Sequence, residues 1–120
     1  MKQITIIVQT RSGSTEWPAY MTNTPGLAVC RSPWEDYDNP GQYTPGDTWR
    51  VVHIGSGKKL PQCYSFKTRR DASLMAYALK TIVDWKLDEE GLNEASRHDK
   101  ATGKAWSTKF AEIKRRIFGE

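Results

Sequence analysis

The side chains best suited to acid–base catalysis are scarce in this sequence. Only two histidines occur among the 120 residues: His53 lies in a β-rich run and His98 in a polar stretch. Neither a Gly-x-Ser-x-Gly nor a His-Glu-x-x-His pattern is present. A histidine within a strand is usually a hydrogen-bonded structural residue. We therefore predict a protein that is not an enzyme, and keep an enzyme with His53 as general base as an alternative.

The two cysteines, Cys30 and Cys63, are too few for a disulfide framework and lack the Cys-x-x-Cys spacing of a metal or redox site. Small buried thiols are the expected outcome. Together with His53 they could offer three zinc ligands if their strands were neighbours, but a fourth ligand is not evident. The prediction is therefore no metal and no cofactor.

An acidic aromatic segment spans residues 32–48, where three prolines interrupt any regular period. A long loop in a small domain is often functional. Aromatic side chains give contact area to a protein partner, and carboxylates could imitate nucleic-acid phosphates toward a basic partner. The predicted partner-binding residues are Trp34, Glu35, Asp36, Tyr37, Asp38 and Tyr43.

Basic residues gather in the second half of the chain. Residues 1–54 have a net charge of −1 and residues 55–120 a net charge of +5, which together give the +4 of the whole chain. Clustered cations at a helix start or along a helix can bind phosphates. The alternative prediction is thus a nucleic-acid-binding module. Its expected anion-binding residues are Lys58, Lys59, Arg69, Arg70, Lys109, Arg115 and Arg116.

The elements of the first half read as strands and loops. Alternation of apolar residues or β-branched composition predicts strands, and glycine and proline clusters predict the connections. Residues 10–26 are expected to form a loop, and the last two strands a hairpin around a turn at residues 55–58. The expected strands cover residues 3–9, 27–31, 48–54 and 59–66.

The second half is expected to be helical at both ends. Thr68 and Asp71 resemble a capping box, which predicts a long helix from residue 68 to Glu90 with Gly91 as its stop. Residues 92–104 are expected to be a polar linker, either loop, frayed helix or mobile segment. Spacings of four, three and four then predict an amphipathic terminal helix. Its apolar stripe consists of Trp106, Phe110, Ile113 and Ile117.

Length and composition limit the architecture. A chain of 120 residues corresponds to one domain, and no apolar run approaches the length of a membrane span. The expected fold is α+β: an antiparallel sheet of three to four strands packed on a long helix, with a second amphipathic helix at the C-terminus. A cytoplasmic monomer is expected, or a homodimer if the terminal stripe is not used by the core.

Four sequence runs resemble small domains encoded by bacteriophages and mobile elements. These are GLAVCR at residues 26–31, WRVVHIGSG at 49–57, FKTRRDA at 66–72 and VDW at 83–85. Such domains share a strand, a W-x-V-x-H-x-x-S-G hairpin and an F-x-T-+-+-x-A helix start. A weaker similarity is to the arm-binding domains of phage integrases, which enter their helix with the same pattern.

The resemblance implies a phage setting and thus a host cytoplasm. With no catalytic motif in the chain, it favours a non-enzymatic accessory protein that binds a host protein or complex. An inhibitor of a bacterial defence system, similar to anti-CRISPR proteins, is the example that fits this size and charge pattern best.

Overall fold

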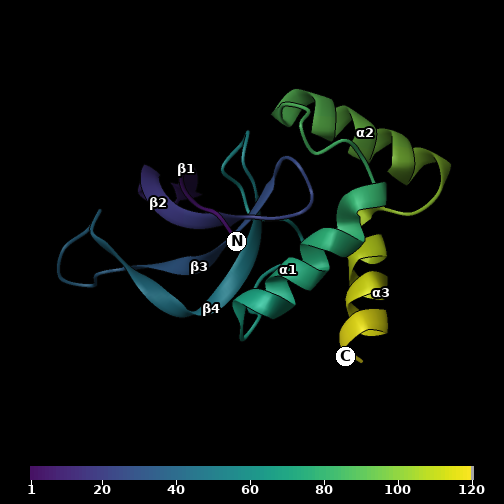
Figure 1. Cartoon of the computed structure of the whole chain (residues 1–120). Helices are drawn as coiled ribbons and strands as arrows, with labels where there is room; N and C mark the ends of the chain where they lie inside the picture. The colour runs from purple at the N-terminus through teal and green to yellow at the C-terminus, as the bar shows by residue number, and fades with distance from the viewer. Residues whose placement is uncertain (120) are drawn as a thin grey trace.

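A four-stranded antiparallel sheet and three helices form the α+β fold of the computed structural model, which describes residues 1–119. The strands pair in chain order, and each neighbour is antiparallel (Figure 1). They are β1 (Gln3–Thr10), β2 (Gly13–Met21), β3 (Leu27–Glu35) and β4 (Tyr43–His53). The α+β class and the antiparallel sheet are confirmed. No helix within residues 1–119 has the length and apolar character needed to span a bilayer.

The predicted loop at residues 10–26 is wrong, because most of it is strand β2. Trp17 and Ala19 alternate with exposed neighbours and are buried, which is the pattern of a half-buried strand. Pro18 obscured this pattern. The Met21 amide donates to Lys2 O, and ladder bonds recur at every second residue, so the nitrogen of Pro18 faces away from β1. β2 pairs with β3 only at Tyr20 and Met21, and the proline therefore breaks no ladder bond.

The predicted acidic loop at residues 32–48 is also shorter than expected. β3 continues to Glu35 and β4 starts at Tyr43, so residues 36–42 alone connect the two strands. The proline positions fit the ladder because Pro33 is paired with Pro45 and an irregularity between Arg31 and Pro33 shifts the register. The hairpin therefore projects from the sheet as a two-stranded ribbon (Figure 1).

The expected strand at residues 59–66 is an irregular segment beside β4. Only two isolated bridges form, Val52–Lys59 and Trp49–Phe66, although further backbone bonds join Val51 to this segment. Positive φ angles of 62° at Gln62 and 69° at Ser65 interrupt the extended conformation. The turn at residues 55–58 is present as predicted.

The long helix predicted for residues 68–90 is replaced by two shorter elements. α1 (Arg69–Ala78) begins as expected, with the Thr68 hydroxyl accepting from the Asp71 amide at 3.1 Å. It passes into a 3₁₀ turn, η1 (Leu79–Thr81). There the buried Trp85 donates its indole N–H to Leu79 O at 2.8 Å, which satisfies a carbonyl group at the end of the helix. This tertiary contact is not visible in the sequence period.

The predicted polar linker at residues 92–104 is largely helix α2 (Glu89–Thr102). Asp88 caps this helix by accepting from the Gly91 amide at 2.8 Å, so Gly91 lies in a first turn and does not end a helix. Glu89 and Glu90 lie in the same turn, where the helix dipole favours negative charge. Acidic residues interpreted as the end of one helix are thus the start of the next.

Helix α3 (Trp106–Phe118) confirms the predicted terminal helix. Its residues Trp106, Phe110 and Ile113 are buried, and Ile117 is 38% exposed. The aromatic rings of Trp85, Trp106 and Phe110 lie with centroids 5.5 to 6.1 Å apart. The stripe is therefore part of the core.

Two core clusters lie on the two faces of the β3–β4 hairpin. Helices α1 and α3 cover one face, and the β1–β2 hairpin covers the other (Figure 1). Cys63 belongs to the core cluster under the helices, and Cys30 belongs to the cluster under the β1–β2 hairpin. Both cysteines are free and fully buried, and burial raises the pKa of each thiol to about 12. Because the sheet separates them, the Cys30–Cys63–His53 zinc alternative is wrong, and residues 1–119 contain no metal-ligand cluster.

Candidate functional site

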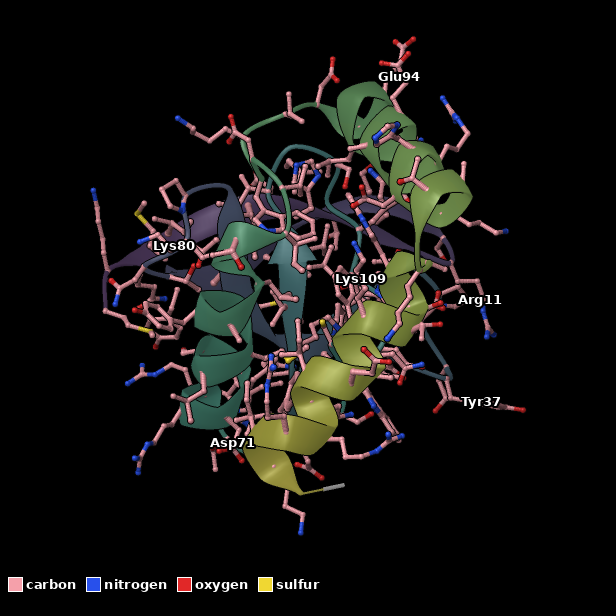
Figure 2. All side chains as sticks on the ribbon, turned by 90° about the vertical axis from the view of Figure 1, so that its right-hand side faces the viewer. Arg11, Tyr37, Asp71, Lys80, Glu94 and Lys109 are labelled. Carbon is pink, nitrogen blue, oxygen red and sulfur yellow. The ribbon has the colours of Figure 1, made fainter. Side chains whose placement is uncertain are left out.

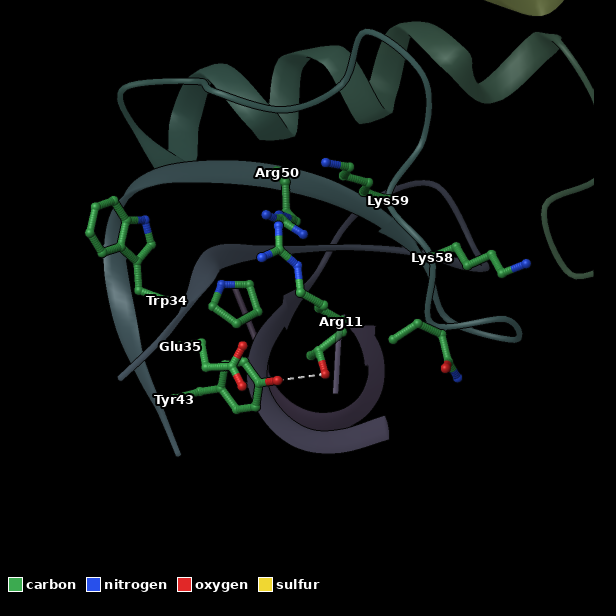
Figure 3. A pocket seen from close by; sticks show the side chains of 10 residues that line it. Arg11, Trp34, Glu35, Tyr43, Arg50, Lys58 and Lys59 are labelled. Atoms are coloured by element: carbon green, nitrogen blue, oxygen red, sulfur yellow. Dashed lines mark hydrogen bonds between the residues drawn. The ribbon is translucent and has the colours of Figure 1, made fainter. Parts of the chain in front are cut away.

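A groove of about 850 Å³ opens at one end of the space enclosed by the two β-hairpins (Figure 3). We name it the basic aromatic groove. It lies between the β1–β2 turn, the last residues of β3 with the first residue of β4, and the chain that leaves β4. Its lining residues are Gln9, Thr10, Arg11, Pro33, Trp34, Glu35, Tyr43, Arg50, Lys58 and Lys59.

Hydrogen bonds hold the walls of the groove in place. The Gln9 amide donates to Gly57 O at 2.9 Å, which ties the end of β1 to the turn after β4. Tyr43 donates its hydroxyl proton to Thr10 Oγ1 at 2.8 Å across the floor. Gly57 has a φ of 71°, and a Cβ there would lie 2.4 Å from Ile7 O, so only glycine permits this closure.

Positive charge dominates the groove. Arg11 and Arg50 point toward one another from opposite walls (Figure 3), and neither forms a salt bridge within residues 1–119. Arg50 is half-buried, and this burial lowers the pKa of its guanidinium. Its Nε donates to Ser32 Oγ at 3.2 Å, which leaves the terminal nitrogens toward the groove. Two arginines without a salt bridge in the described residues thus face one space, which the Glu35 carboxylate also lines.

The two lysines at the rim have partners outside the groove. Lys58 pairs with Glu89 at the start of α2, and the Lys59 ammonium lies 4.6 Å from the centre of the Tyr64 ring. Both contacts are on exposed side chains, where an ion pair contributes little to stability. These lysines therefore remain able to turn toward a ligand.

Trp34 is the exposed aromatic wall of the groove. Its side chain is 68% exposed, and its ring lies over Gly46, where an added Cβ would come within 2.8 Å of Trp34 Cδ1. Tyr43 is half-buried and has its hydroxyl engaged with Thr10. Trp34 is therefore the ring with a free face.

The structure divides the predicted partner-binding set. Trp34, Glu35 and Tyr43 line the groove, whereas Asp36, Tyr37 and Asp38 lie in the connection between the strands. Tyr37 is 99% exposed and extends away from the body (Figure 2).

The carboxylates of this segment are used to hold its turn. Glu35 Oε1 accepts from Ser12 Oγ at 2.6 Å and from the Gly41 amide at 3.0 Å, and these bonds lower the pKa of Glu35. Asp36 accepts from Asn39 Nδ2 and from the Asp38 amide, both at 3.0 Å, which lowers the pKa of Asp36. Phosphate imitation by these two carboxylates would therefore compete with the bonds that shape the turn.

The predicted anion-binding set is dispersed. Lys58 and Lys59 line the groove, but the other members lie on the helices: Arg69 and Arg70 in the first turn of α1, and Lys109, Arg115 and Arg116 on α3. Arg69 stacks on the Tyr20 ring at 4.4 Å, and Lys109 pairs with Asp99 at 3.4 Å. The structure therefore does not bring this set together.

Sequence reasoning missed Arg11 and Arg50. Arg50 interrupts the apolar run of its strand, which is a usable signal, since a charge within a buried strand needs a reason. Arg11 lies in a tight turn beside glycine and has no distinguishing signal.

The contacts of His53 are those of a structural residue. It is buried, with Nε2 3.0 Å from Trp85 O and 2.9 Å from Leu87 O. Its Nδ1 accepts from the Ser56 amide at 3.1 Å, so the proton lies on Nε2 and points to the two carbonyls. Both ring nitrogens thus join β4 to its neighbouring turns.

Comparison of the chain with protein-family models, with curated proteins and with solved structures found no match, so the resemblance to phage-encoded domains stays a prediction.

Proposed function

We propose that this chain is a non-enzymatic binding module whose basic aromatic groove holds the phosphate groups of a nucleic acid. The single observation that supports this is the pair of arginines, Arg11 and Arg50, which converge on the groove and form no salt bridge within residues 1–119, although the carboxylate of Glu35 also lines the groove.

Half-burial takes the Arg50 guanidinium partly out of water, which lowers its pKa. An anionic ligand would compensate for this lost hydration. Guanidinium groups are suited to phosphate because their planar N–H groups match two phosphate oxygens at once. Lys58 and Lys59 at the rim add charge that would draw the ligand in.

The test is a fluorescence anisotropy titration with labelled DNA and RNA oligonucleotides at several salt concentrations. We expect the logarithm of affinity to fall linearly with the logarithm of salt concentration. The double variant Arg11→Gln/Arg50→Gln should bind more weakly and with a shallower slope. Arg115→Gln/Arg116→Gln removes the same charge from α3, outside the groove, and should retain the groove's affinity. If the two double variants lose affinity equally, or no oligonucleotide binds at low salt, the proposal is wrong.

A second candidate is binding of a host protein through the tip of the β3–β4 ribbon. The observation that favours it is the exposure of Tyr37, at 99%, beside Trp34, at 68%. Exposed aromatic side chains on a rigid hairpin are typical anchors of protein interfaces. In the phage setting that the sequence resembles, such a partner would be a component of a bacterial defence system.

Mutations distinguish this candidate function from the first. A saturable protein partner, recovered from bacterial lysate by the wild type and lost with Tyr37→Ala, should be retained by Arg11→Gln/Arg50→Gln. If the partner is instead lost with Arg11→Gln/Arg50→Gln and retained with Tyr37→Ala, the ribbon tip is excluded as the anchor.

We further propose a cytoplasmic monomer. Three of the four residues of the terminal stripe, Trp106, Phe110 and Ile113, are used by the core, so a homodimer through that stripe lacks its apolar surface. Sedimentation of the purified chain at several concentrations tests this.

A further inference from the structure

We infer that the basic aromatic groove selects single-stranded over duplex nucleic acid, with one base stacked on Trp34 and the adjacent phosphate held between Arg11 and Arg50. This inference rests on the proposed nucleic-acid function and adds the form of the ligand and the division of roles.

The position of Trp34 supports base stacking. Trp34 and the two arginines line the same groove, with the Trp34 ring at one end of it and the guanidinium groups nearer its middle (Figure 3), so one strand could place a base at that end and a phosphate between the arginines. Its indole is 68% exposed although the close approach of Gly46 restricts it from behind. A ring that is fixed on one side and free on the other loses little conformational entropy when a base stacks on it.

The shape of the groove disfavours a duplex. Arg50 is half-buried beneath the rim, so its guanidinium is recessed and reaches a flexible strand more easily than the rigid backbone of a double helix. Duplex DNA is usually read by a helix or a two-stranded ribbon that enters the major groove. Both β-hairpins line the groove, but the turn of β1–β2 is bonded to the other hairpin through Ser12 and Glu35, so the β3–β4 hairpin is the one whose tip extends beyond the groove.

The charge of the ribbon tip opposes that mode of binding. Asp36 and Asp38 lie in the tip, and the lowered pKa of Asp36 keeps its carboxylate ionised at neutral pH. Phosphates that line a major groove would meet these charges at close range. A single strand that lies in the groove beside the tip meets four cations, Arg11, Arg50, Lys58 and Lys59, and one carboxylate, that of Glu35.

The experiment compares three labelled DNA probes of about 12 nucleotides, a length within the site sizes of single-strand-binding folds. The probes are a pyrimidine single strand, the same strand with abasic sites in its central positions, and the duplex of the first. We expect the intact single strand to bind most tightly. Trp34→Ala should weaken it by about fivefold to a hundredfold, the range of one base stacked on an aromatic ring.

The controls separate stacking from other effects. Trp34→Ala should leave binding of the abasic strand nearly unchanged, because no base remains to stack. Trp34→Phe should retain most of the affinity, since it keeps an aromatic face. Tyr37→Ala removes an even more exposed ring that lies outside the groove and should change nothing. Thermal melting of each variant verifies the fold, and the quenching of tryptophan fluorescence on binding should be smaller without Trp34.

The outcomes distinguish the two proposals. If the duplex binds as tightly as the single strand, or Trp34→Ala affects the intact and abasic strands equally, the single-strand inference is overturned while an arginine-dependent affinity keeps the proposed function. If none of the three probes binds at low salt, both are overturned.

Discussion

Replacement of Arg50 by methionine distinguishes an arginine that maintains the fold from one that is held ready for a ligand. The side chain is half-buried, donates one hydrogen bond to Ser32 and forms no salt bridge within residues 1–119. Methionine preserves an unbranched aliphatic stem of similar reach. The variant therefore removes the charge and the hydrogen bond and retains much of the packing.

The structure limits the expected loss of stability. The hydrogen bond from Arg50 contributes about 1–2 kcal/mol. Ser32 is not left unsatisfied, because its hydroxyl also bonds Thr48 Oγ1 at 3.1 Å. Release of a partly desolvated charge offsets the lost bond. We expect the free energy of unfolding to change by less than about 1 kcal/mol, whereas breaking a buried ion pair costs about 3–5 kcal/mol.

Urea unfolding followed by tryptophan fluorescence measures this difference. The slope of free energy against urea should be unchanged, since the exposed surface of the unfolded chain is the same. In the same variant the salt dependence of single-strand binding should fall by about 0.7 in the logarithmic slope, the share of one phosphate contact. Arg31→Met is the matched control, because Arg31 stacks on Trp49 outside the groove. A loss of more than about 2 kcal/mol with an unchanged salt slope would refute the reasoning.

Three further predictions concern the fold around the site. Asp88→Ala should lower the free energy of unfolding by about 1 kcal/mol in urea, because it removes the N-cap of α2, and Asp88→Asn should restore it; equal losses in both variants would mean that the cap bond is not the cause. The lowered pKa of Glu35 implies stability that is complete above its ordinary value of 4.5 and is lost as pH falls through the lower value of the folded state. Glu35→Gln should reduce the acid sensitivity of unfolding in that range, and an NMR titration midpoint of Glu35 at or above 4.5 would contradict the assignment. Both thiols have a pKa raised to about 12 by burial, so a thiol reagent at pH 8 should modify neither Cys30 nor Cys63 until denaturant is added. Rapid modification of the native chain would show that one of them is accessible.

Local patterns explain where sequence-based prediction succeeded. The Thr68 cap, the alternation in β1 and the stripe of α3 depend on residues within a few positions of one another. The errors occurred where contacts distant in sequence override the local pattern. Pro18 fits a strand only because β2 leaves that edge unpaired, and Trp85 ends the first helical segment through its bond to Leu79.

The candidate site shows the same division. Trp34, Glu35, Tyr43, Lys58 and Lys59 were identified from composition and spacing, although they were assigned to two separate surfaces. Nothing in the sequence indicates that they share one groove.

The sequence by itself determined the class of the fold, the helix start at Thr68, the terminal helix and the types of side chain available for binding. Only the tertiary structure decided that Arg11 and Arg50 meet, because Arg11 lies in the turn after β1 and Arg50 in β4, and these two strands are at opposite ends of the sheet order. The bond from Gln9 to Gly57 draws those ends together, and glycine is the residue that permits this approach. Hydrophobic burial between the two hairpins stabilises this closure, and the groove with its excess of positive charge is the result.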